Sequence, residues 1–262
     1  MGQDDPVSIK KMKFGFIFFK LFCLVNKYLT ESPAQDIALI EHGIQKEKIY
    51  LIPQFVSFDD FHGVSLDKKN ELRKKYNIDK NGILITSIGR IGYRKGTDVT
   101  IKTFVKLNDK YPNVHLLLVG LTDKTPKELL NEISLIKSKN NNIHTMSRVD
   151  NIREIFNISD YFLLPSRNEG FGLVVIESMA CNVPVVVSDL KGIFDSIVKQ
   201  KHSGVIVHGF DPNDYAKAIE SLLRDGAKKD RIINNAIENI QNNYSPDLIV
   251  KRFNQLFHEL ID

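Results

Sequence analysis

YFLLPSRNEGFGLVVIE, residues 161–177, runs from a short apolar segment through a turn with two glycines into a second apolar segment. The run YFLL is continuous and apolar, as expected of a parallel strand whose two faces are both covered by helices. Gly170 and Gly172 lie where this strand would pass into a helix, so backbone N–H groups can point outward and the positive helix end can face an anion. The stretch therefore predicts a strand, an anion-binding turn and a helix, in that order.

The same alternation of short β-branched runs with helical stretches fills the chain from residue 83 onward. This alternation is the pattern of βαβ units around a parallel sheet, so the sequence predicts an α/β fold. The expected strands are Ile83–Ile88, Val114–Val119, Ile143–Met146, Tyr161–Leu164, Val183–Val187 and Val205–Val207. The expected helices are Asp98–Lys110, Pro126–Ser138, Ile152–Ile158, Phe171–Ala180 and Ile193–Lys199, followed by two that begin at Asp211-Pro212 and Ser245-Pro246.

The N-terminal part of the chain is less regular. It contains a helical stretch to about His42, the short run Ile49–Ile52, and then Pro53 with the passage FVSFDDFHG. Proline, glycine and the loss of periodicity indicate a linker, so we expect a domain boundary between residues 53 and 70. We therefore expect three parts: the remnant of another domain and its linker (1–60), the α/β domain (61–244) and a helix that packs back toward the N-terminal part (245–262).

Two carboxylates bracket the glycine turn. Glu169 lies just ahead of the predicted helix and Glu177 lies on it, so we expect the two carboxylates to bind different parts of an extended ligand. Carboxylates accept hydrogen bonds from sugar and ribose hydroxyls. Together with an anion-binding turn they favour a nucleotide sugar. Taken alone, a G-x-G at a helix start is weak evidence, and an ordinary surface helix with a solvated glutamate stays an alternative.

A second loop strengthens the case for an anionic ligand. SIGRIGYRKGTD, residues 87–98, follows the first predicted strand and places Arg90, Arg94 and Lys95 at the sheet edge where open α/β folds bind ligands. Cations in this position would neutralise a diphosphate, and arginine can do so through two parallel hydrogen bonds. The loop is neither a Walker A motif nor a G-x-G-x-x-G fingerprint, which argues against an NTPase or a dehydrogenase.

Composition sets wider limits on function. With 42% apolar and 26% charged residues the chain has the balance of a globular protein. Its net charge of +4 is too small and too scattered to indicate nucleic-acid binding. Cys23 and Cys181 lie far apart and have no Cys or His companions, so we expect no metal site and a reducing, cytosolic setting.

An apolar run near the N-terminus, Phe14–Val25, follows several lysines. Lys20 interrupts the run, no small-residue cleavage site follows, and twelve residues are too few to span a bilayer as a helix. We expect a buried or half-buried helix, and a helix at a membrane surface stays the alternative.

The combined motifs resemble the C-terminal donor-binding domain of the glycosyltransferase family 4 enzymes, which have the GT-B fold of two Rossmann-like halves. Gly89–Gly96 matches the family's G-R-x₄-K-G, and Glu169 with Glu177 matches its E-x₇-E motif within P-S-x-x-E-G-F-G-L. The resemblance runs from about Tyr28 to the end of the chain and implies a Rossmann-like parallel sheet flanked by helices, preceded by a partial second domain.

The resemblance also implies roles for individual residues. Catalytic roles fall to Glu169, Arg90 and Lys95: the two cations would hold the donor's diphosphate, and Glu169 would hold the donor sugar. The substrate-binding residues implied are the backbone of Gly170, Phe171, Gly172 and Leu173 for sugar and phosphate, Glu177 for the ribose hydroxyls, and the Ser147–Val149 loop, with Val149, near the base. Enzymes of this kind retain anomeric configuration and usually need no bound metal or other cofactor.

The resemblance further implies a transferase of the group 1 type, with a UDP-, GDP- or ADP-linked sugar as donor and a glycan, lipid or other molecule as acceptor. The family has a complete N-terminal acceptor domain, of which this chain matches only the last portion, so we expect turnover to need a partner chain or a homo-oligomer. Ser147 stands where the family usually has glycine, which leaves the choice of base open. A noncatalytic nucleotide-sugar-binding module and a sugar-nucleotide epimerase stay alternatives.

Overall fold

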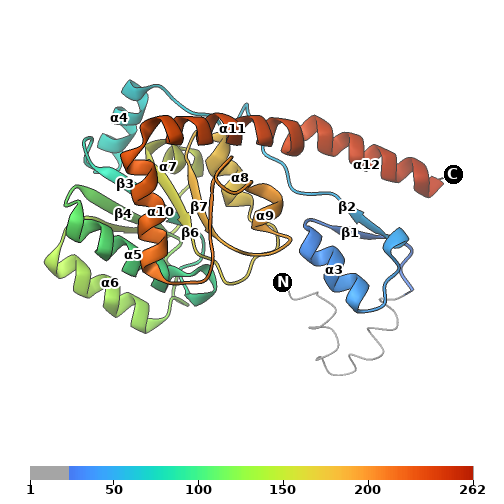
Figure 1. Ribbon diagram of the computed structural model, residues 1–262, viewed down its shortest axis with the longest axis horizontal. Coiled ribbons are helices and arrows are strands. Elements are labelled where there is room, and N and C mark those ends of the chain that lie inside the picture. Colours follow the sequence, from blue (N-terminus) through green and yellow to red (C-terminus); the bar gives the residue numbers. More distant parts are fainter. Residues whose placement is uncertain (1–23, 262) are drawn as a thin grey trace.

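A six-stranded parallel sheet forms the centre of the structure (Figure 1). The computed structural model describes residues 24–261, and the side chains of residues 24–260. The sheet has the order β5-β4-β3-β6-β7-β8, and every neighbouring pair is parallel. Its strands are β3 (Ile83–Ile88), β4 (Val114–Val119), β5 (Ile143–Met146), β6 (Tyr161–Leu164), β7 (Val185–Ser188) and β8 (Val205–Val207).

Helices cover both faces of the sheet, because successive residues of a strand point their side chains to opposite sides. On β3, for example, Leu84 belongs to one core cluster and Ile85 to the other. One face is covered by α4 (Leu66–Lys75), α7 (Ile152–Ile158), α8 (Leu173–Ala180) and α9 (Phe194–Ile197). The other is covered by α5 (Thr97–Lys110), α6 (Lys127–Lys139) and α10 (Pro212–Arg224), while α11 (Gly226–Tyr244) contributes to both clusters.

The predicted α/β fold is confirmed, and five of the six strands have the predicted bounds. The strand predicted from Val183 begins at Val185 instead, because the Val183 N–H bonds back to the Ser178 carbonyl and closes α8. The helix predicted from Phe171 begins at Leu173, because Gly172 has a φ of 99° and stands outside the helix as its N-cap. The helix predicted over Ile193–Lys199 shortens to α9.

Helix α4 lies partly inside the segment where the sequence indicated a linker. Ser65 accepts a hydrogen bond from the Lys68 N–H and caps this helix. Apolar periodicity did not predict α4, because this helix is strongly charged and buries only Leu72 and Arg73.

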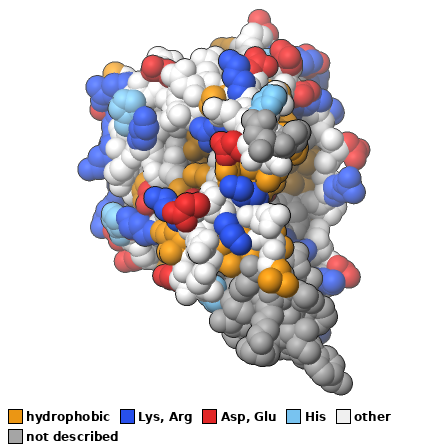
Figure 2. All heavy atoms as spheres, turned by 90° about the vertical axis from the view of Figure 1, so that its right-hand side faces the viewer, with side chains coloured by type: hydrophobic (Ala, Val, Ile, Leu, Met, Phe, Trp, Pro, Cys, Tyr) orange, Lys and Arg blue, Asp and Glu red, His pale blue; other side chains and the backbone are white. Residues whose placement is uncertain are grey.

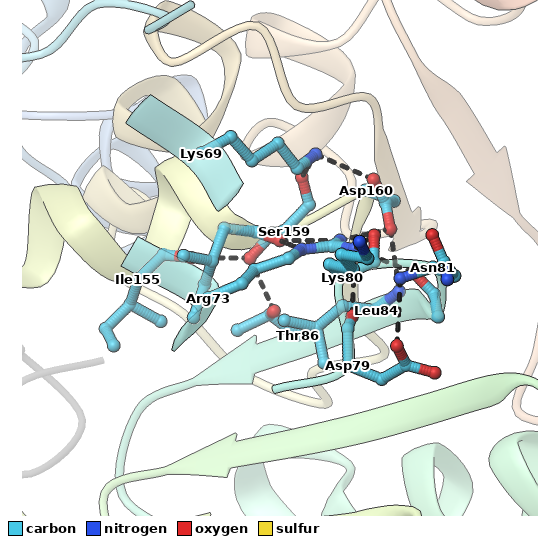
Figure 3. Close-up of polar contacts among 12 residues, drawn as sticks. Lys69, Arg73, Asp79, Lys80, Asn81, Leu84, Thr86, Ile155, Ser159 and Asp160 are labelled. Carbon is cyan, nitrogen blue, oxygen red and sulfur yellow. Dashed lines mark hydrogen bonds and ion pairs between the residues drawn. The ribbon is translucent and has the colours of Figure 1, made fainter. Parts of the chain in front are cut away.

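The Arg73 guanidinium ties α4 to the sheet (Figure 3). Its Nε and Nη2 donate to the Ile158 carbonyl at 3.0 and 2.8 Å, and Nη1 donates to the Gly82 carbonyl at 2.8 Å. Nη2 also bonds Asp160 at 2.6 Å, and Asp160 in turn accepts from Lys69 and from the Leu84 N–H. This buried network lies where β3 and β6 begin.

A small lobe precedes the main sheet. It contains β1 (Tyr28–Thr30), α3 (Pro33–Glu41), the short helix η1 (Lys46–Lys48) and β2 (Ile49–Leu51), with β1 and β2 paired in parallel. Its own core is formed by Tyr28, Leu39 and Ile44. The long C-terminal helix α12 (Pro246–Ile261) reaches over to the lobe, where Ile249 and Leu256 pack against Ile52 (Figure 1).

The lobe keeps apolar side chains at its surface. Leu29, Ile37, Ile40 and Leu51 are all exposed. On the face drawn in Figure 2, Lys and Arg side chains are interspersed with acidic and apolar ones.

Between residues 24 and 261 no helix has the length and apolar character needed to cross a membrane. The helix predicted over Phe14–Val25 lies almost wholly outside the described residues, and the division at residues 60 and 244 stays a prediction.

Candidate functional site

The two loops singled out in the sequence follow neighbouring strands. From β3 the chain proceeds to β4 and β5 on one side, then returns so that β6 pairs with the other side of β3. Such a reversal of strand order is the point where open α/β sheets bind ligands, outside the carboxyl ends of the strands. The loop of residues 89–96 and the turn of residues 165–172 both lie there.

An ion pair joins these two loops. Lys95, at the end of the short helix η2 (Tyr93–Lys95), places its Nζ 2.6 Å from Oε1 and 2.8 Å from Oε2 of Glu169. Ser166 donates a further hydrogen bond to the same carboxylate at 2.6 Å, and Arg94 Nη1 lies 3.9 Å away. Glu169 is only 7% exposed. Two of the predicted catalytic residues are thus in direct contact, and the carboxylate is held in one orientation.

A second ion pair fixes the distance between the loops. Arg167 donates to both oxygens of Asp98 at 2.8 Å and to the Tyr93 carbonyl at 2.6 Å. The Arg167 N–H also bonds the Arg94 carbonyl at 2.8 Å. Burial alone would raise the pKa of the Asp98 carboxyl, but the hydrogen bonds and charge of Arg167 hold it below its usual value. Asp98 stays ionised and the loops stay joined.

Gly96 allows the loops to approach this closely. Its φ is 69°, and a Cβ at this position would lie 1.9 Å from the Pro165 carbonyl oxygen. We expect Gly96→Ala to destabilise the protein well beyond the roughly 1–2 kcal/mol that a left-handed backbone costs alanine. Gly43→Ala is the matched control, because Gly43 has a φ of 89° and nothing within 4 Å of its Cβ position. Urea unfolding of both variants measures the difference; equal losses would show that the contact with Pro165 is unimportant.

The second glutamate, Glu177, lies on α8 and is half-buried. No hydrogen bond or ion pair of its carboxylate is formed with any residue that the structure describes. Burial raises its pKa to about 7. A half-buried acid without a partner is costly in the free protein and is typical of a ligand-binding position.

We expect Glu177→Gln to stabilise the free protein at alkaline pH. Because the folded-state pKa is raised, the wild-type protein loses stability as pH rises from about 4.3, the ordinary value for glutamate, through about 7. Glutamine removes this loss, so the variant should be more stable at pH 8, by on the order of 1 kcal/mol or more, and equal near pH 4. Urea unfolding at both pH values tests this, with the exposed Glu128→Gln as control; a gain that is the same at both pH values would contradict it.

The remaining predicted residues have different surroundings. Arg90 is exposed, and its side chain forms no hydrogen bond or ion pair with any residue from 24 to 261. Val149 is partly buried and packs on the larger core cluster. Phe171 is buried with its ring 5.8 Å from Tyr244, so only its backbone is available. Gly172 and Leu173 form the start of α8, which has no side-chain cap and leaves N–H groups for an anion.

Sequence reasoning assigned no role to Asp98, Ser166 or Arg167. All three lie inside the two quoted motifs, but no local pattern indicated what their side chains contact. Pairing between residues 69 positions apart in the chain carries no local signal, and only the adjacency of β3 and β6 brings Asp98 and Arg167 together.

A Rossmann-like sheet with a ligand edge of this kind is one half of the GT-B architecture. Solved structures with the same fold as this chain belong to that class. The model of the glycosyl transferases group 1 family matches residues 68–239. This is well over half of the chain, and it contains both loops and both glutamates. The protein belongs to that family.

Curated relatives agree with this assignment. The chain is 27% identical to the capsular polysaccharide biosynthesis glycosyltransferase CapM of Staphylococcus aureus, over 97% of this chain and 68% of CapM. It is 28% identical to N,N'-diacetylbacillosaminyl-diphospho-undecaprenol alpha-1,3-N-acetylgalactosaminyltransferase of Campylobacter jejuni, over 95% of this chain and 63% of that enzyme. The chain thus spans about two thirds of the length of these relatives.

A solved structure shows the same fold. HepE of Anabaena in complex with UDP-glucose superposes with a TM-score of 0.82 at 19% identity, covering 98% of this chain and 70% of HepE.

Proposed function

We propose that this protein transfers a sugar from a nucleotide-sugar donor to an acceptor with retention of anomeric configuration. The observation that carries the proposal is the contact of Lys95 with the buried Glu169 carboxylate, at the strand reversal and beside the uncapped start of α8. Family membership supports the transferase class. The retaining outcome rests on the resemblance to the family 4 enzymes.

In the proposed complex, Lys95 and Arg90 bind the donor's diphosphate. Leaving-group departure places negative charge on that diphosphate, and fixed cations and backbone N–H groups stabilise such charge best when no reorganisation is needed. The N–H groups at Gly172 and Leu173 add the positive end of α8. We propose that these groups act without a resident metal or other cofactor.

Glu169 and Glu177 then take opposite ends of the donor. Glu169, oriented by Lys95 and Ser166, accepts hydrogen bonds from the sugar. Glu177 accepts from the ribose hydroxyls, which would supply the partners that its carboxylate lacks in the free protein. Val149 lies nearer the base. In the free protein the Lys95 ammonium group is already paired with the Glu169 carboxylate. In the complex the same ammonium group would contact both this carboxylate and the diphosphate.

The acceptor side is part of the same proposal. The lobe of β1, α3 and β2 keeps Leu29, Ile37 and Leu51 exposed, which would suit a further domain, a partner chain or a second copy. A glycan or lipid acceptor would then bind between that partner and the sheet edge. We propose a cytoplasmic location, a reducing setting in which Cys181 would stay a free, buried thiol.

A thermal-shift and calorimetry panel tests the proposal, because a ligand that binds only the folded state raises its apparent stability. The panel compares UDP, GDP and ADP with UDP-glucose, GDP-mannose and ADP-glucose. We expect one base to be preferred, and transfer from that donor in a membrane or cell extract that supplies acceptor and partner. NMR of the product then gives its anomeric configuration. No binding of any nucleotide would overturn the proposal; binding without transfer favours a noncatalytic module, and product without acceptor favours an epimerase.

A further inference from the structure

A cavity of about 140 Å³ lies between the small lobe and the sheet edge. On the lobe side it is lined by the start of α3, including Ser32 and Gln35, and on the other side by Glu169, Gly170 and Lys191. Pockets for drug-sized ligands measure about 300–1,000 Å³, so this cavity suits one sugar ring and not a whole nucleotide.

Ser32 has an unpartnered hydroxyl in this wall. It stands at the N-cap of α3, where a serine side chain normally accepts a hydrogen bond from the first turn, yet it makes no capping bond. The residue is fully buried, and its Oγ has no hydrogen-bond partner among the residues described. Buried hydroxyls are nearly always bonded, so an unpaired one in a residue that lines a cavity is a position where a polar group of a ligand would supply a partner.

Gln35 presents a donor to the same space. Its Oε1 accepts from the Glu31 N–H at 2.7 Å, which fixes the amide plane and directs Nε2 the other way. Nε2 lies 3.7 Å from the position that a Cβ on Gly170 would occupy. It donates no hydrogen bond to any residue from 24 to 261. The amide is therefore held beside the turn that carries Glu169, with its donor group available.

The start of α3 is fixed against the main domain. The Ala34 N–H bonds the Gly192 carbonyl at 3.0 Å. Gly192 has a φ of 69°, and a Cβ there would lie 2.6 Å from the Ala34 nitrogen. This close approach sets where Ser32 and Gln35 face the Glu169 turn.

We propose that Ser32 and Gln35 bind hydroxyl groups of the donor's sugar and determine which sugar the protein accepts. The inference rests on the proposed function and extends it to two residues of the small lobe. Ser32 Oγ can donate or accept, Gln35 Nε2 donates, and Glu169 accepts, so the three groups match neighbouring sugar hydroxyls from different sides. A site with buried groups that must be paired discriminates strongly against a sugar whose hydroxyl points elsewhere.

Calorimetry of the full chain tests this with two ligands per variant: the preferred nucleoside diphosphate and its glucose or mannose conjugate. We expect Ser32→Ala and Gln35→Ala each to lower affinity for the sugar nucleotide roughly fivefold, the value of one hydrogen bond, and to leave affinity for the diphosphate unchanged. Gln45→Ala is the control, because Gln45 is an exposed residue of the same lobe.

Thermal unfolding separates binding from a structural role. Because the Ser32 hydroxyl is buried and unpaired, Ser32→Ala should leave the melting temperature of the free protein unchanged or raise it. The inference is overturned if both variants keep the wild-type difference between sugar nucleotide and diphosphate, if the wild-type protein binds the two equally, or if both ligands weaken alike. Absence of diphosphate binding to the wild-type protein would instead contradict the proposed function.

Discussion

Lys95→Met will weaken binding of the donor's diphosphate about 10- to 100-fold and will slow transfer by about 10²- to 10³-fold. The first figure follows from the roughly 1.5–3 kcal/mol of a hydrogen bond to a charged group, and the second from the loss of a preorganised group that stabilises charge in the transition state. Methionine keeps the length of the side chain without its charge. Calorimetry with the preferred nucleoside diphosphate and a transfer assay measure the two effects.

Stability must be separated from binding in this variant. Glu169 is 7% exposed and would keep Ser166 as its remaining close partner, so the lone substitution leaves a buried charge poorly compensated. The double variant Lys95→Met/Glu169→Gln removes that charge and should regain much of the lost stability while diphosphate binding stays weak. Lys106→Met, at an exposed lysine of α5, is the control. Diphosphate affinity within twofold of wild type in Lys95→Met would exclude Lys95 from the phosphate site.

The sequence was sufficient to predict that the two loops share one edge of the sheet, because its signals are local. Most strands of the main sheet are largely apolar runs, and each motif directly follows one, so both loops could be assigned to one edge. What it could not supply is the contact between them. Whether Lys95 would meet Glu169 depends on β6 pairing with β3, a relation between residues 74 positions apart.

Other features were hidden for a different physical reason. Helix α4 is mostly charged, and its single buried arginine is held by carbonyl groups that leave no trace in side-chain periodicity. The small lobe has strands of only three residues, too short for an alternating pattern. The role proposed for Ser32 and Gln35 also depends on tertiary structure, since Gly192 is what brings α3 against the Glu169 turn.

Asp160→Ala will destabilise the protein by about 3–5 kcal/mol, the usual cost of removing one partner of a buried ion pair. Asp160 bonds Lys69 at 2.7 Å, Arg73 at 2.6 Å and the Leu84 N–H at 2.8 Å. Arg73 is 3% exposed and cannot recover its lost partner from water. For a chain of this size the loss lowers the melting temperature by roughly 6–20 °C. Asp123→Ala, at an exposed aspartate, should change it little.

The pH dependence of stability tests whether the charge of Asp160 causes this loss. Burial alone would raise the pKa of Asp160, but the charges of Lys69 and Arg73 outweigh it and hold the pKa below the ordinary value. Its contribution to stability is therefore present above about pH 4 and is lost as pH falls through the lowered pKa. Asp160→Asn should show a deficit at pH 7 that shrinks in acid. A deficit independent of pH would mean that shape and hydrogen bonding, not charge, are responsible.

Binding measurements on the same variant separate the two ends of β6. Asp160 immediately precedes this strand, whereas Ser166 and Glu169 follow it, so the ion-pair network and the ligand edge lie at opposite ends of the strand. Well below its melting temperature, Asp160→Ala should therefore bind nucleoside diphosphate with nearly wild-type affinity, whereas Lys95→Met should not. Weakened binding in a folded Asp160→Ala protein would instead mean that α4 and its buried arginine set the position of the loops across the full length of the strand.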